Sequence, residues 1–138
     1  MNFSLYIHAA NIGFMLMFII VVAPAVFKVL SQKAAASFLR VLFPRLFMFG
    51  FVTASIATIF SMADGELLIT VVSTVIAFGF LFNALIITPK INQSRDRANS
   101  GEVDAEKIFA RLHLISVGIF SIQFVASLGL IISHSYWI

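Results

Sequence analysis

The stretch LLITVVSTVIAFGFLFNALIITP, residues 67–89, contains no Asp, Glu, Lys or Arg. A helix needs about 20 apolar residues to cross a bilayer core of about 30 Å. Three further charge-free windows occupy residues 1–27, 46–63 and 112–138. All four windows are apolar on every side, whereas the strands of a membrane barrel alternate apolar and polar residues. The sequence therefore predicts an all-α integral membrane protein, an up-and-down bundle of four transmembrane helices.

The overall composition excludes the ordinary water-soluble classes. The chain has 138 residues, of which 61% are hydrophobic and 11% are charged, and its mean hydropathy is +1.06. A soluble domain usually carries about 25% charged residues. There is no cysteine, so we expect neither a disulfide framework nor a thiolate metal site. We expect no nucleic-acid partner, because the basic residues follow a membrane topology.

We expect one domain over residues 1–138, with spans at about residues 3–27, 44–63, 67–89 and 112–133. The first window is interpreted as a retained span, because no Lys or Arg precedes it and it is too long for the apolar region of a signal peptide. The segment from Ser31 to Phe43 predicts a short interfacial helix with Ser31 as its N-cap. Pro44 would then open the second span, since a proline in the first turn costs little.

The basic residues set the predicted orientation. Four of them lie between the first two spans or at the start of the second span: Lys28, Lys33, Arg40 and Arg45. The other five lie between the third and fourth spans: Lys90, Arg95, Arg97, Lys107 and Arg111. The positive-inside rule then puts the loops 28–43 and 90–111 in the cytoplasm and both termini outside. We expect a bacterial inner membrane. The lipid bilayer is the expected partner, with anionic lipids attracted to the basic cytoplasmic rim by about 1 kcal/mol per residue.

Unusual residues converge on the predicted cytoplasmic face. Pro24, Pro44 and Pro89 lie near span ends, where each can leave a backbone carbonyl without its helical partner. Asn83 lies inside the third span, where its amide needs partners from other helices. His113 shares a helical face with Ser116 and Phe109. The candidate binding residues are Arg45, Asn83, Pro89, Asn92, Arg95, Asp96, His113 and Ser116.

Two interpretations of this inner-face cluster stay open. In the first, it forms a polar pocket that opens to the cytoplasm and binds or passes a small molecule or a lipid. In the second, it is loop architecture, in which the prolines shape helix ends and Arg95 and Asp96 pair with charges of the other loop. The spans contain no Asp, Glu, Lys or Arg, which argues against a pump or an ion-coupled transporter.

His8, near the outer end of the first span, carries a separate hypothesis. A neutral imidazole there could be an axial ligand of haem b. The alternative is a polar side chain bonded to a neighbouring helix or to water. His134 lies near the outer end of the fourth span and could pair with His8, although its neighbours are typical of an interfacial belt. No metal-ligand spacing and no other cofactor motif is present.

Five motifs in order carry a family resemblance: His8 with residues 23–27 (APAVF), residues 42–44 (LFP), the spacing from Asn83 to Pro89, residues 89–92 (PKIN) with Arg95-Asp96, and residues 109–116 (FARLHLIS). Together they resemble the transmembrane-protein-205-like family, also catalogued as domain of unknown function 4149. The resemblance covers nearly the whole chain. It implies four spans and no established reaction. A looser similarity is to four-span proteins related to bacterial protoporphyrinogen oxidase, but this third span lacks their His or basic residue.

Three functional hypotheses follow from these residues. The first is a protein that binds or passes a small molecule or lipid at the cytoplasmic face. The second is an accessory subunit of a larger membrane complex, because so small a chain has scarcely any mass outside the membrane; a homo-oligomer also stays open. The third is a haem-binding redox protein with His8 as ligand. No Ser/His/Asp arrangement or phosphate loop predicts an enzyme, so we expect binding rather than catalysis.

Overall fold

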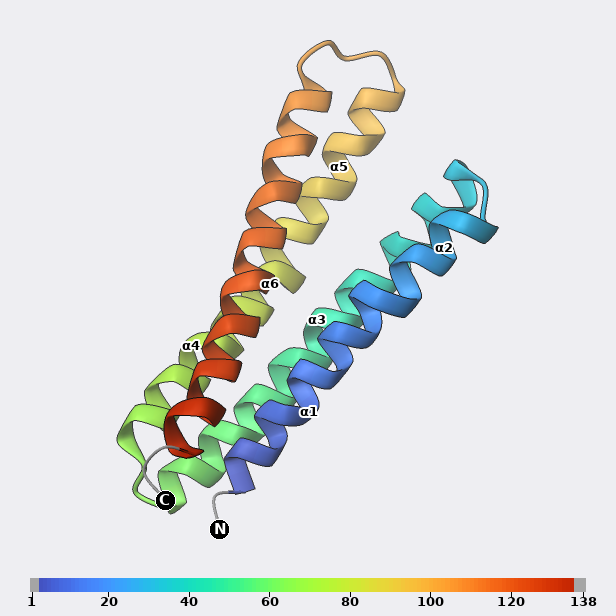
Figure 1. Cartoon of the computed structure of the whole chain (residues 1–138). Coiled ribbons are helices and arrows are strands. Elements are labelled where there is room, and N and C mark those ends of the chain that lie inside the picture. Colours follow the sequence, from blue (N-terminus) through green and yellow to red (C-terminus); the bar gives the residue numbers. More distant parts are fainter. Residues whose placement is uncertain (1–2, 136–138) are drawn as a thin grey trace.

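A computed structural model describes residues 3–135 of the chain, and these form helices joined by short turns (Figure 1). In chain order the elements are α1 (Phe3–Met17), η1 (Phe18–Val22), α2 (Ala23–Val29), α3 (Gln32–Ala63), α4 (Leu67–Phe82), η2 (Asn83–Ile87), α5 (Thr88–Asn99) and α6 (Ala105–Ser135). The elements η1 and η2 are single π-helical turns within longer helices.

These elements make four continuous helices, each long and apolar enough to cross a membrane: Phe3–Val29, Gln32–Ala63, Leu67–Asn99 and Ala105–His134. They pack together as the four-helix membrane bundle that the charge-free windows predicted. The turn around Gly65 joins α3 to α4, and Gly65 has a φ of 74°, a conformation that glycine adopts without strain.

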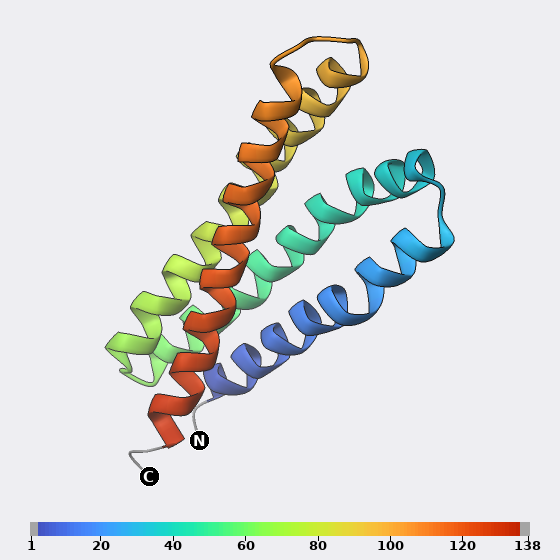
Figure 2. The same ribbon diagram turned by 45° about the horizontal axis from the view of Figure 1, so that its top comes forward.

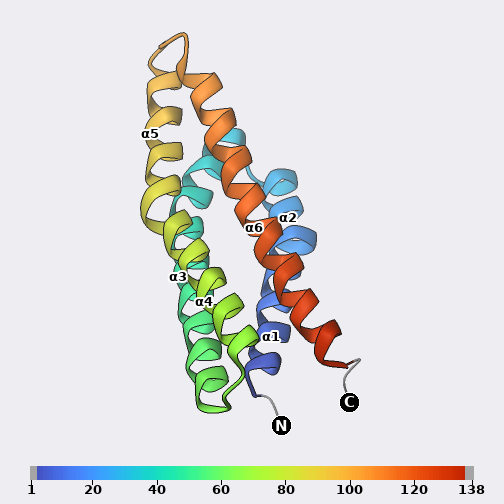
Figure 3. The same ribbon diagram turned by 90° about the vertical axis from the view of Figure 1, so that its left-hand side faces the viewer.

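The bundle is closed at one end and splayed at the other. Figures 1 and 2 show α1 and α3 close to α4 and α6 near the α3–α4 turn, whereas α2 diverges from α5 and α6 at the opposite end. Figure 3 shows α5 and α6 side by side up to their connecting turn. The splayed end holds all nine Lys and Arg residues, and we call it the basic end.

The predicted interfacial helix is not a separate element. Residues 32–43 are helical and Ser31 caps them, accepting a hydrogen bond from the Ala34 N–H at 3.3 Å. However, α3 continues through Pro44, which lies in its interior rather than at the start of a span. A proline removes only one helical hydrogen bond. The Arg45 side chain donates to the Val41 carbonyl at 2.9 Å, within the same turn.

The two connections at the basic end are also shorter than expected. Only residues 30–31 separate α2 from α3, and residues 100–104 separate α5 from α6. Most of the predicted loop 90–111 is helical, because the third helix runs on to Asn99 and α6 begins at Ala105. Residues 100–104 form the turn between these two helices. Arg97 and Glu102 clamp this turn, and the Arg97 guanidinium, bonded to the carboxylate, holds the pKa of Glu102 below its usual range.

Small residues let α3 and α4 approach closely in the core. Ala54 and Ala57 of α3 are fully buried, and Gly50 lies against the ring of the fully buried Phe80. A Cβ placed on Gly50 would stand 2.7 Å from that ring. Close packing of this kind stabilises helix pairs in membranes, where lipid is as apolar as the side chains themselves.

Candidate functional site

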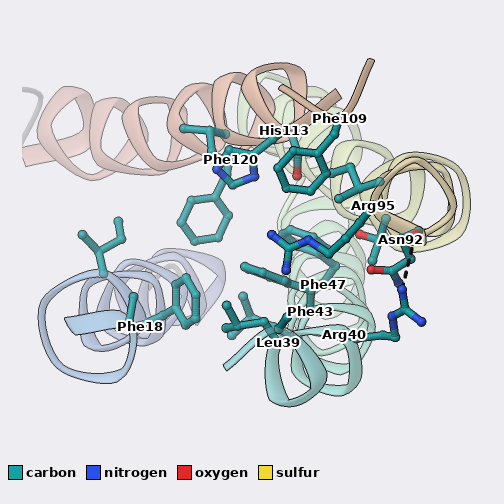
Figure 4. Close-up of a pocket in the computed structure, with 18 of the residues that line it drawn as sticks. Phe18, Leu39, Arg40, Phe43, Phe47, Asn92, Arg95, Phe109, His113 and Phe120 are labelled. Atoms are coloured by element: carbon teal, nitrogen blue, oxygen red, sulfur yellow. Dashed lines mark hydrogen bonds between the residues drawn. The ribbon is translucent and has the colours of Figure 1, made fainter. Parts of the chain in front are cut away.

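A cavity of about 510 Å³ lies where the bundle splays at the basic end. Its walls come from η1, α2, α3, α5 and α6, so no single helix hairpin could form it. The size falls within the range of about 300–1,000 Å³ that is typical of small-molecule sites. Figure 4 shows this space surrounded by side chains of all these helices.

Most of the cavity wall is apolar and much of it is aromatic. The apolar lining residues are Phe18, Ile19, Ala23, Phe27, Ala36, Leu39, Phe43, Leu46, Phe47, Ile91, Phe109, Val117 and Phe120. The polar lining residues are Arg40, Thr88, Asn92, Arg95, His113, Ser116 and Ser121. Thr88, Asn92 and Arg95 come from α5 and form what we call the polar wall. The α6 side adds His113, Ser116 and Ser121. The predicted polar pocket is therefore a largely apolar cavity with polar residues on its α5 and α6 sides.

Arg95 is the charged group that enters the cavity. Figure 4 shows its side chain crossing from α5 into the middle of the space. Its guanidinium carbon lies 4.6 Å from the centre of the Phe109 ring, a cation–π contact. The Phe109 ring is in turn parallel to His113 within 5°, with ring centres 6.1 Å apart. The stack leaves the N–H edge of the guanidinium available to an acceptor.

Arg95 has no carboxylate partner in the described part of the chain. The ion pairs within residues 3–135 are Arg40–Asp96 and Arg97–Glu102. Arg40 of α3 donates to the Asp96 carboxylate and to the Asn92 carbonyl, the latter at 3.2 Å, and so ties α3 to α5. No Asp or Glu from the described residues lines the cavity. The cavity therefore presents an uncompensated positive charge.

Thr88 adds an unsatisfied hydroxyl to the same wall. Its residue is 3% exposed, it lines the cavity, and its Oγ1 has no hydrogen-bond partner within residues 3–135. A buried polar atom without a partner costs free energy, about 1–3 kcal/mol. An acceptor or donor on a bound molecule would remove that cost. Arg95 and Thr88 lie two turns apart on α5, so both face the cavity.

The family model described as "Domain of unknown function (DUF4149)" matches residues 7–100. The chain belongs to this family. No curated protein and no solved structure matches the chain. The DUF4149 match contains the cavity walls from η1, α2, α3 and α5, whereas the α6 wall lies beyond residue 100.

The structure brings together half of the candidate residues. Asn92, Arg95, His113 and Ser116 line the cavity. The other four lie outside the cavity lining and contact the helices around it. Asn83 donates its amide N–H to the Ser116 carbonyl at 3.3 Å, and Asp96 pairs with Arg40. Arg45 donates a hydrogen bond within its own helix, and Pro89 follows the π turn η2. The pairing expected for loop architecture is found for Asp96, which pairs with Arg40, and not for Arg95. The binding of a small molecule or lipid at this cluster stays a prediction.

Sequence reasoning missed the aromatic wall of this DUF4149 protein. Phe18, Phe47 and Phe120 line the cavity, but among 16 Phe residues nothing in the sequence distinguishes them. Phe43 also lines the cavity, and it stands in the LFP motif. Thr88 was missed as well, although its position directly before Pro89 was a usable signal. Asn83 and Pro89, which lie on either side of Thr88 in the sequence, indicate an irregular helical turn there.

His8 lies elsewhere, in the closed half of the bundle. It is fully buried, and its two ring nitrogens contact Ser73 Oγ at 2.8 Å and Ser127 Oγ at 3.1 Å. The interpretation as a side chain bonded to neighbouring helices agrees with these contacts, but His8 is in the core rather than at an interface. Both ring nitrogens of His8 thus have serine partners in this structure, and neither contact is with His134. The assignment of His8 as a haem ligand stays a prediction.

Proposed function

We propose that this protein binds a small amphipathic anion, a molecule with an apolar body and a negatively charged head, in the cavity at the basic end. The observation that carries the proposal is Arg95, an arginine without a carboxylate partner in residues 3–135, inside a largely aromatic cavity. The apolar body of the bound molecule would cover the aromatic wall and shield it from solvent. Its anionic oxygen would accept hydrogen bonds from the Arg95 guanidinium.

The chemistry favours binding over catalysis. His113 lines the cavity together with Arg95, and its ring is stacked on Phe109, with no hydrogen bond to a nucleophile within the described residues. The Thr88 hydroxyl has no base within hydrogen-bond reach there. A nucleophile needs such a base, held in turn by a third group. We therefore propose a carrier, sensor or binding role, with the Arg95 guanidinium as the recognition group.

The membrane orientation belongs to the same proposal. Nine basic residues at the splayed end and two acidic residues in the α3–α4 turn support a cytoplasmic basic end with both termini outside. We propose a bacterial inner membrane as the location. We also propose that the resemblance to transmembrane-protein-205-like proteins reflects common descent within the wider family.

Native mass spectrometry of the protein, extracted from its own membrane in mild detergent, tests the binding proposal. Wild type should carry an added mass that tandem fragmentation identifies as an anion with an apolar part. Arg95→Gln should lose most of it, because a charged hydrogen bond contributes about 1.5–3 kcal/mol. Lys90→Gln is the matched control, since Lys90 is an exposed cation on α5 that does not line the cavity.

Three results would count against the proposal. One is a wild type without added mass, and another is the same added mass in wild type and Arg95→Gln. The third is added mass that belongs to other polypeptides in fixed ratio, which would make an accessory subunit the better description.

A further inference from the structure

The cavity opens sideways, toward the surface that a membrane helix presents to lipid. Three of its lining residues are at the same time strongly exposed: Ile19 of η1 at 49%, Phe27 of α2 at 67% and Val117 of α6 at 46%. A residue that both lines a cavity and faces outward marks the opening. These three come from the helices that diverge in Figures 1 and 2. The opening therefore lies between η1–α2 and α6.

This side opening lies at the depth of lipid acyl chains. Ile19 precedes Lys28 by nine residues and Val117 follows Arg111 by six. At about 1.5 Å per residue these separations are about 13 Å and 9 Å along the helices. The stretches that flank the opening belong to the charge-free windows of the first and last spans. Phe27, directly before Lys28, lies at the headgroup end of the same opening. A ligand that enters between Ile19 and Val117 comes out of the hydrocarbon layer.

The polar wall is placed where the head of such a ligand would be. Arg95 and Asn92 lie beyond Pro89, toward the basic end from Thr88, and all three line the cavity. The uncompensated guanidinium selects a negative charge, and the unsatisfied Thr88 hydroxyl supplies one more hydrogen bond. Arginine binds phosphate oxygens through two parallel N–H groups. A zwitterionic phospholipid has the same oxygens, but its ammonium group repels the guanidinium, so a head with net negative charge is favoured.

From this combination we infer that the occupant is an anionic phospholipid of the leaflet at the basic end. One acyl chain enters between η1–α2 and α6 and lies against the aromatic wall, and the phosphate is held by Arg95. This inference rests on the proposed function and adds the source and class of the ligand. The occupant is thus a component of the bilayer itself, and a soluble anion from the cytoplasm is the alternative that the test must separate.

Fluorescence quenching by spin-labelled lipid gives a direct test. The reporter is a Phe120→Trp, Trp137→Phe variant of the full chain, which places the only indole on the cavity wall. The protein is reconstituted into phosphatidylcholine vesicles with a small fraction of lipid that carries a nitroxide on an acyl chain. We expect nitroxide phosphatidylglycerol to quench several-fold more effectively than nitroxide phosphatidylcholine. Inorganic phosphate added to the buffer should not reverse the quenching.

Substitutions in the reporter background assign the effect to the site. Arg95→Gln should abolish the several-fold preference for phosphatidylglycerol, so that the two lipids quench about equally, while Arg95→Lys keeps part of the preference and Lys90→Gln keeps most of it. Ile19→Phe with Val117→Phe narrows the opening and should reduce quenching several-fold. Met17→Phe with Leu114→Phe is its control, since both residues are exposed and neither lines the cavity.

The outcomes separate this inference from the proposed function. Suppose that the two lipids quench equally while the native mass spectrum still shows an Arg95-dependent anion. That result overturns the assignment of the occupant as an anionic phospholipid and leaves the binding proposal intact. Displacement by inorganic phosphate assigns the site to a soluble anion and also overturns the inference. Unchanged quenching in the Ile19/Val117 variant refutes the side entry. Absence of both quenching preference and added mass rejects the inference and the proposed function together.

Discussion

Gly50 is the residue at which helix packing leaves the least room. A Cβ there would lie 2.7 Å from the Phe80 ring, and Phe80 is fully buried, so the ring has no exposed space to move into. We expect Gly50→Ala to destabilise the protein by about 1–3 kcal/mol, the usual cost of overpacking a core. Thermal unfolding in detergent measures it.

Gly118→Ala is the matched control for that substitution, because a Cβ at Gly118 meets nothing within 4 Å. It should be neutral or stabilising by about 0.5–1 kcal/mol, since alanine is the better helix former. Equal effects at Gly50 and Gly118 would show that the contact with Phe80 is not what limits the approach of α3 and α4.

His8 is the residue through which α1 is bonded to both α4 and α6. Because its partners Ser73 and Ser127 are also buried, we expect His8→Ala and Ser73→Ala to be non-additive. The coupling free energy should be about 0.6 kcal/mol, the average measured for hydrogen bonds between membrane helices, and no more than about 1.7 kcal/mol. A double-mutant cycle on unfolding free energies measures it.

The control cycle pairs His8→Ala with Ser55→Ala, because the Ser55 hydroxyl donates within its own helix, to the Phe51 carbonyl. These two substitutions should add, with no coupling free energy. A His8–Ser73 coupling no larger than the His8–Ser55 value would mean that the His8 contacts do not stabilise the bundle.

At the scale of single residues, the sequence was most informative where a polar group stood alone in an apolar window. Asn83 could be predicted to need a partner on another helix, and it bonds to the Ser116 carbonyl. The aromatic wall could not be predicted, because whether a Phe faces lipid or a cavity depends on how the helices rotate. Phe120 lines the cavity and Phe78 is 63% exposed, although both sit in equally apolar surroundings in the sequence.

Among the elements, the π turn η2 controls which way α5 faces. Each residue advances an α-helix by about 100°, and a π turn contains one residue more than an α turn. The extra residue of η2 therefore rotates α5 relative to α4, and with it Arg95. Pro89 follows η2 and has no N–H, so it favours this irregular turn.

We expect Pro89→Ala to let residues 83–87 return to a regular α-helix and to turn Arg95 away from the cavity. The anionic mass in the native spectrum should then fall about as far as in Arg95→Gln. Pro44→Ala is the control, because α3 is α-helical on both sides of Pro44 and no rotation follows. Retained binding in a Pro89→Ala protein whose hydrogen exchange shows a regular helix would contradict this role of η2.

Pro44 shows why element boundaries were harder to predict than element types. A proline in the first turn of a helix and a proline in its interior look alike in sequence. The choice was decided by packing, since Ala35 and Leu39 are buried against Val26 of α2 and so extend the buried face of α3 before the proline. Contacts between distant segments of this kind leave no local signature.

On the scale of the whole molecule, the cavity is a consequence of the splay between α2 and the α5–α6 pair. The charge-free windows predicted four helices and their order, and the bundle confirms both. They could not predict the splay, which arises where η1 and η2 interrupt two of the four helices. The orientation of the splayed end in the membrane decides which leaflet, and which aqueous compartment, the cavity serves.

Single-cysteine labelling tests that orientation directly, because the chain has no cysteine of its own. Asp64→Cys marks the exposed α3–α4 turn, and Val103→Cys marks the α5–α6 turn, where Val103 is 89% exposed. With the basic end in the cytoplasm, a membrane-impermeant maleimide should label Asp64→Cys in cells whose inner membrane is intact. It should label Val103→Cys only in inverted vesicles. The reverse pattern would place nine basic residues on the outer side against the positive-inside rule, and would assign the Arg95 cavity to lipids of the outer leaflet.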